Sequence, residues 1–260
     1  MELGLEGKRA VVTGGSKGLG RAIADELARE GAGVAVCART PDEVERAGDE
    51  LRAHGTTVLA EAADVTDPEQ VRTFIARSAE ALGGIDVLVN NAGRAHPGTF
   101  ATLTDEDFRQ DLDVKLFSQI RCSREALPHL RAAESGRIVN INAVYGRYPD
   151  PLFFATSTNR AACLAFTKAL AMEVAEDGVL VNSVNIGFVV TPQWENIHRL
   201  RAPDVPAEEF FAQMAAAEVP LGRFGRADEV AGLVAFLAGA RATYITGASI
   251  DVAGGMGRYL

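Results

Sequence analysis

Short apolar runs alternate with helical patterns along the whole chain. The strand-like runs lie at residues 9–13, 33–38, 57–60, 85–90, 137–142, 179–184 and 246–252. Between them, apolar residues recur every three or four positions, as they do in amphipathic helices. Strands that alternate with helices form a parallel sheet covered on both faces. The pattern predicts a single α/β domain over residues 1–260, a doubly wound, seven-stranded parallel sheet flanked by helices.

Two of the helical patterns differ in their apolar faces. Residues 105–131 place their apolar side chains on one stripe, as expected for a helix on the surface of a sheet. Residues 161–172 are apolar nearly all round. Such a helix needs cover on two sides, and the sheet supplies only one. We therefore expect a subunit interface on this helix.

A glycine-rich loop follows the first strand. Gly14, Gly18 and Gly20 allow a tight turn and a close approach of the backbone to a ligand. The next helix is expected to begin near Gly18 and to point its free N–H groups at the same space, which favours a pyrophosphate. The residues predicted to form this site are Gly14, Ser16, Lys17, Gly18, Leu19 and Gly20.

The loop reads Thr-Gly-x-x-x-Gly-x-Gly from Thr13, and Asn-Asn-Ala-Gly follows at residues 90–93. Together these motifs resemble the short-chain dehydrogenase/reductase family, in particular its 3-oxoacyl-carrier-protein reductases, and the resemblance covers essentially the whole chain. It implies a Rossmann-like fold, a nicotinamide dinucleotide cofactor, and a homodimer or homotetramer with its interface on the helix at residues 161–172.

The resemblance also implies further cofactor contacts. Asp64 and Val65 correspond to the adenine site, although an Asp after a strand is also a common turn residue. Residues 181–192 resemble the family's segment under the nicotinamide, with Ile186 in place of a usual proline. The other implied contacts are Asn91, Ala92, Gly93, Gly187, Val189 and Thr191.

Two cations indicate which dinucleotide binds. An acidic residue after the second strand would take the ribose hydroxyls of NAD, but Ala38 stands there and Arg39 follows it. Lys17 and Arg39 together can bind a 2′-phosphate. The alternative is that both are solvated surface charges. The predicted cofactor is NADP(H).

The family's catalytic tetrad does not match this chain. The resemblance implies an Asn, a Ser, a Tyr and a Lys at positions that here hold Lys115, Ala143, Thr156 and Arg160. A threonine hydroxyl does not titrate near neutral pH, so it cannot replace the tyrosine as proton donor. Loss of a general acid typically costs about 10²–10⁴ in rate, so carbonyl reduction by the family mechanism is expected to be crippled.

Several residues are candidates to replace the lost groups. Arg160 and Lys115 can hold the nicotinamide ribose and polarise or bind an anionic substrate. Lys115 is alternatively a surface lysine on a polar helix face. Asn142 can donate a hydrogen bond to a substrate carbonyl. Tyr145 can supply a phenol from a new direction, or it simply packs with its hydroxyl in water.

Other polar residues near the expected cleft are weaker candidates. Tyr148 is a second possible phenol, and we favour Tyr145 because it lies closer to the strand end. His96 and His198 are interpreted as ordinary loop residues. No cluster of histidines and carboxylates has metal-ligand spacing, so we predict no metal.

Residues 192–220 are expected to form a lid over the substrate pocket. Trp194, Phe210, Phe211 and Met214 lie in this segment and indicate a partly apolar or ring-bearing ligand. Alternatively, part of this set only seats the lid on the domain.

Composition excludes some classes of partner. The net charge is −9 and the pI about 5.0, which opposes an extended nucleic-acid surface. Charged residues near the start exclude a signal peptide, and no apolar run is long enough to span a bilayer. We expect a cytoplasmic protein without membrane or nucleic-acid partners. Cys37, Cys122 and Cys163 are expected to be buried free thiols.

The leading hypothesis is an NADP(H)-dependent oxidoreductase with a remodelled site, acting in secondary metabolism. Its small-molecule substrate would accept hydride without needing a tyrosine acid, as an enone, a quinone-like ring or an iminium does. Two alternatives stay open. One is a non-redox enzyme on the same scaffold, such as a dehydratase, isomerase or cyclase, and the other is a catalytically silent NADP-binding partner or regulatory subunit.

Overall fold

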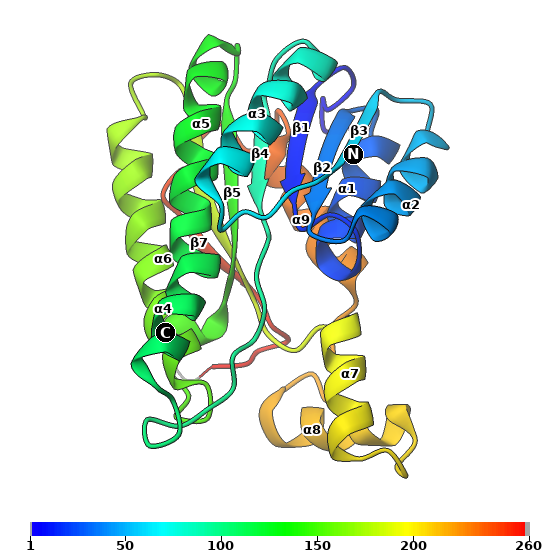
Figure 1. Ribbon diagram of the computed structural model, residues 1–260, viewed down its shortest axis with the longest axis vertical. Helices are drawn as coiled ribbons and strands as arrows, with labels where there is room; N and C mark the ends of the chain where they lie inside the picture. The colour runs from blue at the N-terminus through cyan, green and yellow to red at the C-terminus, as the bar shows by residue number, and fades with distance from the viewer. Residues whose placement is uncertain (1, 258–260) are drawn as a thin grey trace.

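The structure is a computed structural model that describes residues 2–257, and its centre is a parallel sheet of seven strands (Figure 1). The strand order is β3-β2-β1-β4-β5-β6-β7, with every neighbouring pair parallel. The strands are β1 (Arg9–Thr13), β2 (Gly33–Ala38), β3 (Val58–Ala62), β4 (Val87–Asn90), β5 (Arg137–Ala143), β6 (Leu180–Ile186) and β7 (Ser249–Val252). The predicted fold is confirmed.

Helices cover both faces of the sheet, and each face has its own apolar core. On one face α1 (Gly18–Arg29), α2 (Pro41–Arg52) and α9 (Ala227–Ala238) pack on the strands. On the other face lie α3 (Pro68–Leu82), α5 (Ser118–Ala132) and α6 (Phe154–Glu173). The expected free thiols are confirmed, since Cys37, Cys122 and Cys163 are buried and unpaired.

The boundaries of some elements differ from those predicted. The predicted strand 246–252 begins only at Ser249, because Gly247 adopts a φ of +63° in a turn. The predicted helix 105–131 consists of α4 (Asp105–Leu112), a π-helical turn η1 (Asp113–Phe117) and α5. The predicted helix 161–172 is the C-terminal part of α6, which begins earlier and includes Thr156 and Arg160.

Successive strands are added on one side of β1 up to β3 and on its other side from β4 onward, and this switch opens a crevice at the carboxyl ends of β1 and β4. Asn91 follows β4 and spans the crevice floor. Its Nδ2 donates to the carbonyl oxygens of Thr13 at 2.9 Å and Gly14 at 3.1 Å. These bonds join the glycine-rich loop to the loop after β4, so the two loops meet in one site.

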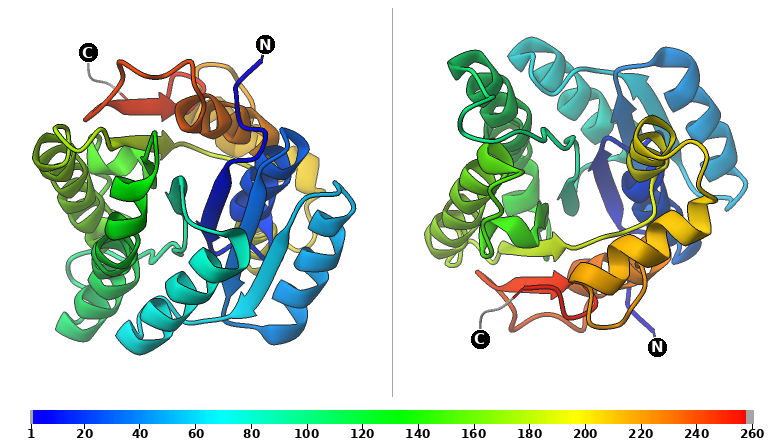
Figure 2. Two further views of the ribbon diagram at one scale, coloured as in Figure 1. Left: turned by 90° about the horizontal axis from the view of Figure 1, so that it is seen from above. Right: turned by 90° about the horizontal axis from the view of Figure 1, so that it is seen from below.

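Two helices project beyond the carboxyl ends of the strands: α7 (Pro192–Arg201) and α8 (Ala207–Glu218) (Figure 1, and from below in Figure 2). An aromatic cluster attaches them to the domain. The ring of Phe188 lies 4.8 Å from that of Trp194 and 5.0 Å from that of Phe224, between centroids. The two helices make up most of residues 192–220, for which the role of a lid over the substrate pocket stays a prediction.

The outer surface of α6 carries apolar side chains. Met172 is 72% exposed and Phe154 is 37% exposed. A homodimer or homotetramer through this helix stays a prediction. No helix within residues 2–257 is both long and apolar enough to cross a membrane.

A matched pair of leucines tests where the core lies. Leu27 on α1 is fully buried, whereas Leu200 on α7 is 76% exposed. We expect Leu27→Ala to lower the free energy of unfolding by about 2–5 kcal/mol, through lost burial and a residual cavity. Leu200→Ala should change it by no more than about 0.5 kcal/mol. Urea denaturation of both variants checks this, and equal losses would contradict the assignment of the core.

Candidate functional site

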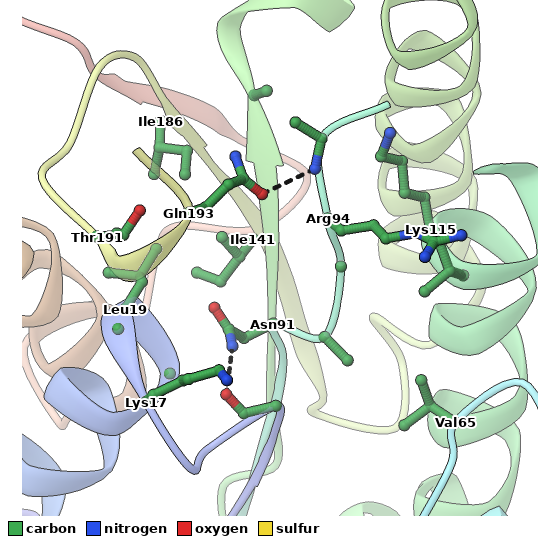
Figure 3. A pocket seen from close by; sticks show the side chains of 18 of the residues that line it. Lys17, Leu19, Val65, Asn91, Arg94, Lys115, Ile141, Ile186, Thr191 and Gln193 are labelled. Atoms are coloured by element: carbon green, nitrogen blue, oxygen red, sulfur yellow. Dashed lines mark hydrogen bonds between the residues drawn. The ribbon is translucent and has the colours of Figure 1, made fainter. Parts of the chain in front are cut away.

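A cavity of about 550 Å³ lies at the carboxyl ends of the strands, between the glycine-rich loop, the loop after β4, the end of β5, α6 and α7 (Figure 3). Its size falls in the usual range of ligand sites. Of the predicted cofactor residues, those that line it are Gly14, Ser16, Lys17, Gly18, Leu19, Gly20, Arg39, Asp64, Val65, Asn91, Ala92, Gly93, Arg160, Gly187 and Thr191.

Val189 is the exception. It is buried in the sheet core and forms a backbone bridge with Gly225, so its side chain does not line the cavity. The family pattern predicts a cofactor contact for Val189, and this stays a prediction for its backbone only. The bridge to Gly225 anchors the chain two residues before Thr191.

The glycine-rich loop has the backbone conformation that the sequence predicts. Gly14 and Gly18 have φ values of +67° and +57°, which other residues rarely adopt. A Cβ on Gly20 would collide with the carbonyl oxygen of Gly14 and the amide of Asn91. Since no side chain caps the start of α1, its first N–H groups face the cavity free to bind an anion.

Lys17 and Arg39 both lie exposed at one end of the cavity. Glu43 also lies there, and its carboxylate is 2.9 Å from the Lys17 Nζ. Sequence reasoning missed this acid, which comes from α2 rather than from the strand end. An exposed pair of this kind contributes only about 0.2–1 kcal/mol, so a phosphate can compete for the lysine.

Asp64 lies on the cavity wall after β3. Its Oδ1 accepts hydrogen bonds from the backbone N–H of Thr66 at 2.9 Å and from the Thr66 hydroxyl at 2.8 Å. The turn thus holds the carboxylate in one orientation at the edge of the cavity.

Lys115 lies inside the protein rather than on a polar helix face. It is only 1% exposed, and it lines the cavity from the π-helical turn η1 (Figure 3). Its Nζ donates to the carboxylate of Asp111 and, at 2.8 Å, to the hydroxyl of Thr156. Burial lowers the pKa of Lys115 to about 8; the positive charge of Arg160 acts in the same direction and Asp111 opposes it.

Asp111 is a buried carboxylate that sequence reasoning did not select. Its other oxygen accepts from the Asn159 Nδ2 at 2.8 Å. Asp111 lies four residues before Lys115, and oppositely charged residues at this spacing on a helix can form an ion pair. This spacing is the feature of the sequence that could have identified Asp111.

Arg160 is also almost fully buried, one helical turn after Thr156 on α6. Its Nη1 donates to the carbonyl oxygen of Ile141 at 2.9 Å. A Cβ on Gly93 would lie 3.1 Å from its Nη2, so the guanidinium sits directly against the loop after β4. Thr156, Lys115 and Arg160 are therefore brought together at one end of the cavity.

Tyr145 lines the cavity, but its phenol is poorly suited to proton transfer. Its ring stacks on Phe153 at 5.0 Å between centroids. Burial raises the pKa of Tyr145 well above its usual range, with the charge of Asp150 adding to the effect. Tyr148 does not line this cavity.

Asn142, His96 and His198 are all bonded within the protein, and His198 lies on α7 rather than in the predicted loop. The Asn142 Nδ2 donates to the carbonyl oxygen of Arg160 at 3.2 Å, and its Oδ1 accepts from the backbone N–H of Ala143 at 3.0 Å. His96 lies 3.2 Å from Asp107, and the His198 Nε2 donates to a backbone carbonyl at 2.7 Å. Neither histidine lines the cavity.

The lid segment contributes only part of its aromatic set to the cavity. Trp194 lines it, whereas Phe210, Phe211 and Met214 do not and instead seat α8 beside α7 and the domain. The Gln193 Oε1 accepts from the backbone N–H of Ala95 at 2.8 Å, which joins the start of α7 to the loop after β4 (Figure 3).

The chain matches known proteins over nearly its whole length. The family model described as short chain dehydrogenase matches residues 8–201. Oxidoreductase UcpA of Salmonella typhimurium is 38% identical over 252 residues, which covers 96% of this chain and 95% of that protein.

Two solved structures resemble the fold closely. One is L-sorbose reductase from Gluconobacter frateurii complexed with NADPH and L-sorbose, with a TM-score of 0.95, 33% identity and full coverage of both chains. The other is an NADPH-bound short chain oxidoreductase from Pseudomonas aeruginosa PAO1, described as containing an atypical catalytic center. It has a TM-score of 0.91, 39% identity and coverage of 96% of this chain and 97% of its own.

The chain belongs to the short-chain dehydrogenase family. NADPH, the cofactor predicted from Lys17 and Arg39, is the one bound in both of these related structures.

The glycine-rich loop gives a direct test of the cofactor site. We expect Gly20→Ala to weaken NADPH binding about tenfold or more, because the new methyl group would push the loop away from Asn91. Gly232 on α9 is the control, since a Cβ there meets nothing within 4 Å and Ala favours a helix. Fluorescence titration with NADPH distinguishes them, and equal affinity of the two variants would contradict this placement.

Proposed function

We propose that this protein is an NADP(H)-dependent reductase of conjugated small molecules, an enone or a quinone-like ring, with a non-standard active site. The observation that carries the proposal is the buried cluster of Lys115, Thr156 and Arg160 in the cavity. In this proposal Lys115 replaces the family's Asn, Thr156 its Tyr and Arg160 its Lys. Ala143 replaces its Ser.

The cluster favours reactions that create negative charge. When hydride adds to the carbon of an enone or a quinone-like ring, an enolate or phenolate oxygen develops, and two fixed cations stabilise it. The same cations repel a positively charged substrate. Of the acceptors considered from the sequence, the iminium is therefore the one that Lys115 and Arg160 disfavour.

Lys115 also supplies the proton that the missing tyrosine would have donated. With a pKa of about 8, its ammonium is mostly protonated at neutral pH and still acidic enough to give up a proton. The proton passes from Nζ to the developing enolate, and solvent protonates the lysine again. Thr156 accepts a hydrogen bond from Nζ and so orients the ammonium.

The remaining cavity residues hold the cofactor in this proposal. The glycine-rich loop and the start of α1 bind the pyrophosphate, Asp64 and Val65 contact the adenine, and Lys17 and Arg39 bind the 2′-phosphate. Arg160 holds the nicotinamide ribose beside Gly93, and Gly187 and Thr191 contact the nicotinamide. The bound cofactor supplies the hydride.

The apolar side of the cavity suits the flat part of such a substrate. Trp194, Phe188 and Met256 line it beneath the lid, together with Tyr145 and Phe153 from the other wall. Aromatic side chains of this kind pack against a ring or an extended conjugated system.

The cofactor preference depends on the two exposed cations. We expect Arg39→Ala to weaken NADPH binding about tenfold or more, because a charge-assisted hydrogen bond contributes about 1.5–3 kcal/mol. NADH binding should change little. The control is Arg46→Ala, which removes an exposed arginine from α2 outside the cavity. Calorimetric titration with both nucleotides checks this. An unchanged ratio of the affinities for NADPH and NADH would show that Arg39 does not bind the 2′-phosphate.

The proposed acid makes turnover depend on pH. We expect the rate of NADPH oxidation with an enone or quinone to fall as the pH rises through about 8, since Lys115 then loses its proton. Lys115→Met should lower kcat/KM by about 10²–10⁴ and abolish this limb of the profile. The matched control, Lys168→Met, changes an exposed lysine on α6. Full activity of Lys115→Met would exclude the lysine as the acid.

A further inference from the structure

Asp111 lies next to the cavity without reaching it. Its side chain is fully buried, one helical turn before Lys115, and it does not line the cavity, whereas Lys115 does. One carboxylate oxygen accepts from the Lys115 Nζ and the other from the Asn159 Nδ2 at 2.8 Å. Asn159 belongs to α6, so this carboxylate joins the helix that carries the lysine to the helix that carries Thr156 and Arg160.

The groups around Lys115 differ in charge. From α6 it faces the guanidinium of Arg160, the hydroxyl of Thr156 and the thiol of Cys163, and from α4 it faces Asp111. Within the described part of the chain, Asp111 is the one carboxylate among these neighbours. A buried lysine beside a buried arginine tends to lose its proton, because burial and the like charge both disfavour the ammonium. Asp111 opposes both effects.

The hydrogen bonds of Lys115 also fix its direction. An ammonium has three protons to donate. Within residues 2–257, Lys115 donates one proton to Asp111 on α4 and one to Thr156 on α6. The third proton is left for the cavity that Lys115 lines.

We propose that Asp111, oriented by Asn159, is a positioning residue that keeps Lys115 protonated and directs one of its protons into the cavity. This inference rests on the proposed function, in which Lys115 donates that proton. Asp111 itself touches neither substrate nor cofactor. It acts only through the lysine.

The chain makes this proposal easy to test by NMR, because it contains only four lysines: Lys8, Lys17, Lys115 and Lys168. Protein labelled with ¹³C at the lysine Cε and saturated with NADP⁺ gives four signals, and Lys115→Met identifies the one from Lys115. In Asp111→Asn, we expect the pKa of Lys115 to fall by about 1–3 units, the usual effect of a neighbouring opposite charge.

The matched control is Asp105→Asn, which removes an exposed carboxylate from the first turn of the same helix. It should leave the pKa of Lys115 unchanged. If Asp111→Asn does not fold, Asp111→Ser removes the same charge with a smaller side chain. An unchanged pKa of Lys115 in a folded Asp111 variant would overturn the proposal and leave Asp111 a structural residue only.

Turnover separates this inference from the proposed function. If the pKa falls in Asp111→Asn, the high-pH limb of the activity profile should move down by the same amount. A shifted pKa without any turnover of enones or quinones would support the role of Asp111 toward Lys115 and refute the proposed reaction. Turnover that needs Lys115 and keeps the same pH limb in Asp111→Asn would support the reaction and overturn the positioning role.

Discussion

A lysine buried beside an arginine is the constraint on which the rest of this site depends. Leaving one buried charge without a partner costs about 3–5 kcal/mol, or else the group changes its protonation state. Here Lys115 keeps its charge near neutral pH because Asp111 lies one helical turn away and Thr156 accepts a second hydrogen bond. The same arrangement places an ammonium of lowered pKa in a cavity that also holds a buried guanidinium, and this combination makes the site chemically distinct.

Two helices and a sheet edge bring these groups together. Thr156, Asn159 and Arg160 lie within about one turn of α6. Thr156 bonds to Lys115 on η1, Asn159 to Asp111 on α4, and Arg160 to the backbone of β5. Between α4 and α5 the helix widens into a single π-helical turn that carries Lys115. Such turns are frequent at functional sites. The parallel sheet places the glycine-rich loop at the same edge, so the anion site and the cations share one cavity.

The sequence predicted the fold and the backbone of the glycine-rich loop well, because both depend on local patterns. Apolar runs gave all seven strands, and the glycines gave the loop whose positive φ values require them. The widened turn at Lys115 has no such pattern, which is why one continuous helix was predicted there. The motif also does not show where a side chain points: that of Val189 enters the core, while its place among the cofactor contacts stays a prediction.

Contacts between distant segments could not be predicted in the same way. Glu43 meets Lys17 across 26 positions, and the Gln193 side chain meets the Ala95 backbone across 98. The protonation state of Tyr145 depends on burial that only the folded chain creates. Asp111 is different, since its spacing from Lys115 was visible, but only its burial shows that the pair lies beside the cavity.

In the proposed reaction, hydride passes from NADPH to the carbon of a conjugated acceptor, and Lys115 and Arg160 stabilise the negative charge that forms. This is measured with NADPH that carries deuterium at both C4 positions of the nicotinamide, a panel of enones and quinones, and mass spectrometry of the products. We expect one deuterium on a product carbon, with a rate that falls strongly in Lys115→Met and is retained in Lys168→Met. Cofactor binding without transfer of deuterium to any acceptor of the panel would contradict it.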